Sequence, residues 1–134
     1  MATQPFSWSD YLTLASELSN RTEEYCLRTA ISRTYYYIYH LARQRIVDNQ
    51  FPIVRGANSH QQIWEKFEND PDPRCQKLYL TAKKIQDKRK QADYDIPYPK
   101  IEGEFPAVIE MAQRFAQELH QLDHRLPANR GVRV

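Results

Sequence analysis

The stretch NRTEEYCLRTAISRTYYYIYHLARQRIVDN, residues 20–49, decides the fold of this chain. It contains no glycine and no proline, and its apolar residues recur at the helical spacing of three or four. These positions are Leu27, Ile31, Tyr35, Ile38, Ala42 and Ile46. Asn20 and Glu23 form a capping-box pattern, so we predict one helix over residues 20–49. Unbroken, it is about 40 Å long, the spine of a small domain.

A second line of side chains follows another face of this helix. At steps of four, three and four, it contains Arg33, Tyr37, His40 and Gln44. Arg33 is two positions from Ile31, about 200° round the helix, so Arg33 and His40 share a face turned away from the apolar stripe. The tyrosines at 35–39 extend most of the way round. Because a helix that is apolar on every side is covered on every side, we expect a second copy of the molecule to supply the extra cover.

Four further helices are predicted around this spine. The first opens at Ser7 or Ser9 and ends before residues 19–20. A short helix begins at Ser59, with Gln62 three residues on as a second capping box, and ends at Asn69-Asp70-Pro71.

The remaining two helices follow a proline-containing turn. Asp72 caps one of them, with Pro73 at its first position. The last starts between Glu104 and Pro106 and is stopped by Pro127. Together, these five helices predict an all-α, up-and-down bundle with one long central helix. We expect a single domain over residues 1–134, with its core at about 8–125 and a flexible tail at 126–134.

Composition limits the classes of function. At 134 residues, the chain is long enough for one domain with a substantial core. Its net charge of +2 gives no strong overall field, so any nucleic-acid site has to be local. No apolar run approaches the roughly 20 residues that cross a bilayer, and the N-terminus lacks an export pattern. Cys26 and Cys75 lack zinc-binding spacing. We expect a cytoplasmic protein without membrane contact, metal or cofactor.

Two motifs resemble the HEPN family of small helical domains. ISRTYYYIYH, residues 31–40, is similar to the central-helix signature of the family, which is an Arg, an aromatic-rich spacer and a His. RKQADY, residues 89–94, resembles the Arg followed by Ala-Asp-Tyr that many members carry after a later helix. The resemblance covers the chain from about Trp8 to Leu122, and it implies a HEPN-like helical bundle.

The resemblance also implies an activity. Ribonuclease members of the family suggest a metal-independent endoribonuclease in which the RNA 2′-OH is the nucleophile. His40 transfers the proton in this reading, and Arg33 stabilises charge on the phosphoryl oxygens. The family further implies a homodimer in which two Arg-His pairs meet. Its setting is a toxin–antitoxin or defence system, with an antitoxin or nucleotidyltransferase as a candidate partner.

Three nearby residues are candidates for supporting this pair. Tyr37 lies between Arg33 and His40 on the same helical line. Lys88 and Arg89 belong to a basic strip that can hold an RNA backbone. For the lysines of this strip we favour a solvated helix end, because cations are favourable near a helix C-terminus.

Asp93 and Tyr94 complete the second motif, and we expect them to be structural. They would fix the exit of the chain from the fourth helix and brace the long helix. Tyr94, Ile96 and Tyr98 are too apolar for a free linker, so we expect all three to pack. A direct contact with substrate is the alternative role for Asp93 and Tyr94.

Two other functions remain open. The same bundle could bind a nucleotide or a protein partner without catalysis, or it could be a structural dimerisation domain. A reachable cleft with both Arg33 and His40 favours the enzyme, and burial of both against tyrosines favours the structural domain. A pocket that contains Lys88 and Arg89 but is remote from His40 favours the binding module.

The other histidines carry weaker signals. His60 falls in the first turn of the short helix at residue 59. His120 and His124 are four apart, a spacing that suits a metal, but no third ligand is apparent. We interpret this pair as a surface feature.

Overall fold

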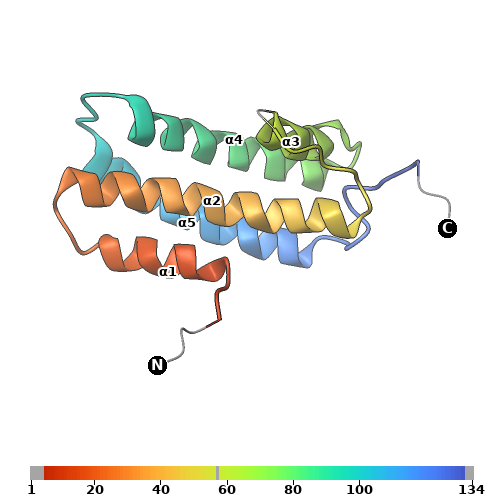
Figure 1. Cartoon of the computed structure of the whole chain (residues 1–134), viewed down its shortest axis with the longest axis horizontal. Coiled ribbons are helices and arrows are strands. Elements are labelled where there is room, and N and C mark those ends of the chain that lie inside the picture. The colour runs from red at the N-terminus through yellow and green to blue at the C-terminus, as the bar shows by residue number, and fades with distance from the viewer. Residues whose placement is uncertain (1–4, 57, 132–134) are drawn as a thin grey trace.

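The computed structural model describes residues 5–56 and 58–131 and contains five helices (Figure 1). They are α1 (Ser9–Leu18), α2 (Glu24–Asp48), α3 (Ser59–Asn69), α4 (Pro73–Tyr94) and α5 (Ile101–Gln121). No strand occurs within these described ranges. The predicted all-α bundle of five helices around one long helix is therefore confirmed.

Helix α2 is the centre of the bundle, and each of the other four helices contacts it. In Figure 1, α1 and α4 flank α2 on opposite sides and α5 runs behind it. The short α3 packs on α4 and on α2. All five helices contribute buried apolar side chains to one continuous core. Among the described residues, no helix has the length and apolar character needed to span a membrane.

The predicted start of α2 and the predicted capping box of α3 are wrong, whereas α3 begins at Ser59 as predicted. Helix α2 begins at Glu24, because Glu23 has an extended backbone and its carboxylate pairs with Arg21. Asn20 therefore caps nothing. The predicted capping box of α3 is also not formed, since the Gln62 side chain bonds both the N–H and the C=O of Val54 instead. Gln62 fixes the preceding loop against α3.

The start of α4 is confirmed, and that of α5 is earlier than predicted. Asp72 accepts a hydrogen bond from the Arg74 N–H, with Pro73 in the first turn of α4. Helix α5 already begins at Ile101 and continues through Pro106. The additional turn buries Ile101 against the core one turn before Phe105, which offsets the loss of the proline N–H.

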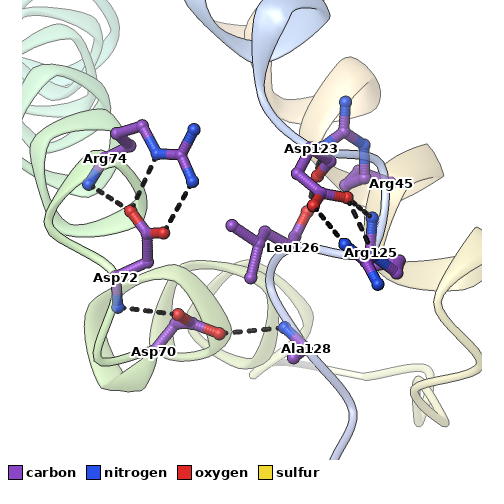
Figure 2. Close-up of polar contacts among 8 residues, drawn as sticks. All are labelled: Arg45, Asp70, Asp72, Arg74, Asp123, Arg125, Leu126 and Ala128. Carbon is purple, nitrogen blue, oxygen red and sulfur yellow. Dashed lines mark hydrogen bonds and ion pairs between the residues drawn. The ribbon is translucent and has the colours of Figure 1, made fainter.

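The segment after α5 is packed, which corrects the prediction of a flexible tail from residue 126. Pro127 is fully buried, and the Ala128 N–H donates to Oδ2 of Asp70 at 2.9 Å. Asp70 also accepts from the Asp72 N–H, so one buried carboxylate joins the α3–α4 turn to the C-terminal segment (Figure 2). The core thus extends past residue 125, while residues 132–134 lie outside the described part.

A buried arginine of α2 holds the same segment. The guanidinium of Arg45 donates to the carbonyl oxygens of Asp123 and Leu126 at 3.2 and 2.9 Å (Figure 2). It also donates to the carbonyl oxygen of Leu119 at 2.7 Å. These carbonyls lie at and beyond the end of α5, where the regular helical bonds stop, and those of Leu119 and Asp123 also accept from the Leu122 and Leu126 N–H groups. Arg45 therefore closes the end of α5 and directs the chain back across the bundle.

Asp70→Ala is expected to lower the free energy of unfolding by about 2 kcal/mol, because two backbone N–H groups lose a buried acceptor. Denaturant titration measures the change. Asp87→Ala is the matched control, since it removes the same charge from an exposed pair with Lys83 at 3.9 Å. Equal stability of the two variants would contradict a structural role for the Asp70 contacts.

Candidate functional site

Helix α1 covers the face of α2 that carries Arg33 and His40. The Trp8 ring lies parallel to the His40 ring, with centroids 3.4 Å apart. The Arg33 guanidinium lies 5.0 Å from the centre of the Tyr11 ring. Trp8 and Tyr11 of the same chain thus supply part of the cover of this face.

Tyr36 lies at the centre of the charged groups on this part of α2. Its ring centre is 5.0 Å from the Arg33 guanidinium and 5.4 Å from that of Arg89, and its hydroxyl accepts from Arg89 Nη2 at 3.3 Å. The His40 and His60 rings lie 6.4 and 5.8 Å from it. We call these five residues the Tyr36 cluster. It gathers two guanidinium and two imidazole groups from α2, α3 and α4.

Both histidines of the cluster are held neutral at neutral pH. Burial lowers the pKa of His40 to about 4, with positive charge on Arg43, His60 and Arg33 as smaller causes. Burial and the charge of Arg89 lower the pKa of His60 as well. Neutral imidazoles can accept a proton or a hydrogen bond, which imidazolium groups cannot.

Arg33 lines the groove between α2 and the end of α4, whereas Trp8 covers one face of His40. Within the described part of the chain, neither side chain makes a hydrogen bond or an ion pair, and Arg33 lies over the faces of Tyr11 and Tyr36. In a purely structural site, Arg33 and His40 would both bond tyrosine hydroxyls. The structure does not show this, because Arg89 donates to the hydroxyl of Tyr36. A guanidinium on aromatic faces retains its N–H groups for an anion.

Arg89 contributes both packing and positive charge to the cluster. Its side chain is 11% exposed and lies over the rings of Tyr35 and Tyr36. Its Nε is 3.7 Å from Oδ2 of Asp93, an ion-pair distance too long for a hydrogen bond. Asp93 also accepts from the Ser32 hydroxyl at 3.5 Å. Asp93 thereby braces α4 against α2, as the second motif predicts.

Two other predicted residues, Lys88 and Tyr37, lie away from the cluster. Lys88 forms an ion pair with Glu104 at 2.8 Å, which ties α4 to the start of α5 and takes this lysine out of an RNA-binding strip. Tyr37 faces a different groove, between α2 and α5, together with His120 and His124. Tyr36, one position earlier, is the aromatic residue that contacts Arg33.

The prediction that Tyr94 and Ile96 pack is wrong. Tyr94 is 74% exposed and Ile96 is 90% exposed, whereas Tyr98 is buried. The Tyr98 hydroxyl donates to Glu104, the same carboxylate that pairs with Lys88. Tyr98 therefore ties the connection between α4 and α5 to the start of α5, whereas Tyr94, at the end of α4, and Ile96 are exposed.

Two grooves each contain one residue of the Tyr36 cluster. One, of about 340 Å³, runs between α2 and the end of α4 and contains Arg33, Ser32 and Asp93. The other, of about 410 Å³, runs between α3 and α4 and contains His60 and Lys90. No group of three metal-ligating side chains is found among the described residues.

The sequence did not predict His60, from a different helix, as a member of this cluster. His60 stacks on Tyr39 with ring centres 4.0 Å apart, and its Nδ1 lies 2.6 Å from the Tyr35 hydroxyl. Its place 25 residues from Tyr35 gives no periodic signal. Only the packing of α3 on α2 brings it to the site.

No family model, no curated protein and no solved structure matches this chain. The HEPN resemblance of the two motifs therefore stays a prediction. Any functional argument has to come from the Tyr36 cluster itself.

Trp8→Ala is expected to raise the pKa of His40 from about 4, because burial is the main cause of its depression and Trp8 covers one face of the ring. An NMR titration of the His40 ring protons measures the shift. Leu14→Ala, another partly exposed apolar residue of α1, is the control. An unchanged pKa in Trp8→Ala would mean that helices other than α1 keep water from the ring.

Proposed function

We propose that this protein is an endoribonuclease of the HEPN type that works without a metal ion at the Tyr36 cluster. The observation that supports this most is the convergence of two guanidinium groups and two neutral imidazoles on one tyrosine. Such a set can bind a phosphodiester and take a proton from the neighbouring 2′-OH. Arg33 and His40 are the residues proposed to act on the substrate.

The proposed reaction uses the nucleophile that RNA already carries. His40 takes the proton of the 2′-OH, and the 2′ oxygen forms a bond to phosphorus while the bond from phosphorus to the 5′ oxygen breaks. The 5′ oxygen takes a proton from solvent, which leaves a 2′,3′-cyclic phosphate and a 5′-OH. Arg33 stabilises the negative charge on the non-bridging oxygens in the transition state. A bound phosphate also raises the basicity of His40 through its negative charge.

A homodimer in the cytoplasm is part of this proposal, with a role in a toxin–antitoxin or defence system and an antitoxin or nucleotidyltransferase as partner. Because α1 covers His40, the free surface beside Arg33 is the place for a second copy. Tyr25, which is 68% exposed, lines the groove beside Arg33 together with Asp93, and the exposed Tyr94 and Ile96 follow Asp93 in the sequence. Light scattering on the purified chain distinguishes a dimer from a monomer.

One observation favours the alternative of a non-catalytic binding module. Trp8 lies against one whole face of His40, and Phe6 packs edge-on against Trp8 at 4.9 Å between ring centres. This cover restricts the approach of a large substrate to His40. A HEPN-like domain that binds a nucleotide or a protein partner through its outer surfaces does not need His40 to be reachable.

The purified protein is expected to cleave a mixed RNA pool in EDTA, and Arg33→Ala and His40→Ala are each expected to lower the rate at least about 100-fold. Cyclic phosphate ends on the products identify the 2′-OH as the nucleophile. Arg114→Ala and His120→Ala are matched controls, because both residues are exposed and distant from the cluster. Cleavage that survives both site substitutions, or no cleavage at all, would remove the catalytic proposal in favour of the binding module.

The pH dependence of cleavage is expected to have its acid limb near pH 4. The profile of kcat/KM reports the pKa of the free enzyme, and His40 must be unprotonated to accept a proton, so kcat/KM falls as the pH drops through about 4. Measurement between pH 3.5 and 8 covers the limb, with folding checked by circular dichroism at each pH. A limb near the ordinary histidine pKa of about 6.5 would assign the base to another group.

A further inference from the structure

Inside the bundle, the hydroxyl of Tyr35 forms hydrogen bonds with side chains from two other helices. It lies 2.6 Å from His60 Nδ1 and 3.0 Å from Trp64 Nε1, both on α3, and 3.3 Å from Gln86 Nε2 on α4. Tyr35 is fully buried, and burial raises its pKa to about 12, so the hydroxyl keeps its proton at neutral pH.

The direction of each of these hydrogen bonds follows from the groups involved. A tyrosine hydroxyl has one proton to donate and lone pairs to accept with, whereas an indole N–H and an amide NH₂ can only donate. Trp64 and Gln86 therefore donate to the Tyr35 oxygen, and the hydroxyl proton is directed to Nδ1 of His60. Since Nδ1 is the acceptor, the proton of the neutral His60 ring is on Nε2.

This arrangement makes His60 a hydrogen-bond donor of fixed orientation. Its ring lies against Tyr39, with centroids 4.0 Å apart and planes at 16°, so the ring cannot turn freely. Nδ1 faces the buried hydroxyl, and His60 itself lines the groove between α3 and α4. The Nε2–H is thus the polar group that His60 offers to a ligand in this groove.

Lys90 and Glu68, which carry opposite charges, lie at opposite ends of the groove. The turn at residues 70–72 makes α3 and α4 antiparallel neighbours, so the start of α3 lies beside the second half of α4. His60 accordingly has Gln86 and Lys90 at its end of the groove, whereas Glu68 lies beside Tyr79 at the other end. Lys90 has no ion-pair partner within the described residues. Glu65, between the two ends, accepts from Gln61 at 2.8 Å.

We propose that the His60 end of the α3–α4 groove binds a backbone phosphate of the RNA strand, with His60 Nε2–H as hydrogen-bond donor and Lys90 as the neighbouring cation. The proposal rests on the proposed function, because the strand bound here is the one cleaved at Arg33 and His40. His60 and His40 lie on either side of Tyr39, at 4.0 and 5.1 Å between ring centres. A phosphate at His60 is therefore close enough to belong to a nucleotide that flanks the cleaved bond.

Binding of a fluorescent 2′-O-methyl oligoribonucleotide, measured by anisotropy, separates this site from the chemistry, since the blocked 2′ position cannot react. His60→Phe keeps an aromatic ring on Tyr39 but has no N–H, and it is expected to weaken binding about tenfold. Lys90→Ala is expected to weaken binding several-fold and to lower the salt dependence by about one phosphate contact. Lys84→Ala, an exposed lysine of α4 outside the groove, is the control and is expected to bind within about twofold of wild type.

A second measurement tests the fixed tautomer directly. A long-range ¹H–¹⁵N spectrum of the wild type is expected to show a protonated Nε2 and an unprotonated Nδ1 for His60, and Tyr35→Phe is expected to mix the two tautomers. Thermal unfolding of His60→Phe shows whether that variant folds, and Lys90→Ala tests the groove at an exposed position that leaves the core intact.

The outcomes separate this proposal from the proposed function. A protonated Nδ1, no binding by the wild type, or equal binding by wild type and Lys90→Ala would overturn the phosphate site. His40→Ala is expected to bind the oligonucleotide like wild type while it loses cleavage. His60-dependent binding by a wild type that cleaves no RNA would support the phosphate site and reject the ribonuclease.

Discussion

The enclosure of α2 by the other four helices constrains everything else in this bundle. A helix with tyrosines on several faces cannot leave their hydroxyls buried without partners, since each such group costs about 1–3 kcal/mol. The partners come from neighbouring helices: His60, Trp64 and Gln86 for Tyr35, and Arg89 for Tyr36. The polar groups that hold the helices in register are therefore the same groups that form the candidate site.

The positive charges of this site outnumber the carboxylates that pair with them. Arg33, Arg43 and Arg89 lie near the two histidines, and Asp93 is the carboxylate that pairs with one of them. Desolvation among these cations favours neutral imidazoles, which lowers the repulsion inside the cluster. The net charge of the chain is only +2, so this local excess of cations would attract an anion without a strong field over the whole surface.

The sequence was sufficient for the features that depend on neighbouring residues. The apolar stripe of α2 and the Asp72 cap of α4 are local patterns, and both are confirmed. The errors lie where distant residues decide. Nothing near Ala128 indicates that its N–H meets Asp70, 58 residues earlier, and nothing near His40 indicates that Trp8 covers it. The two sequence motifs predicted Arg33, His40 and Arg89 as site residues. His60 joins them only through the packing of α3.

The attachment of the segment after α5 has a consequence for the order of events during synthesis. Arg45 donates its side-chain hydrogen bonds to residues 119–126, and the Asp70 carboxylate accepts one of its two from Ala128, so these bonds are missing while the earlier helices are already made. A nascent chain that has released α1 to α4 can collapse around α2, but it retains two charged groups that lack these bonds at one end of the bundle. Its last packing step therefore waits for the end of α5 to leave the ribosome.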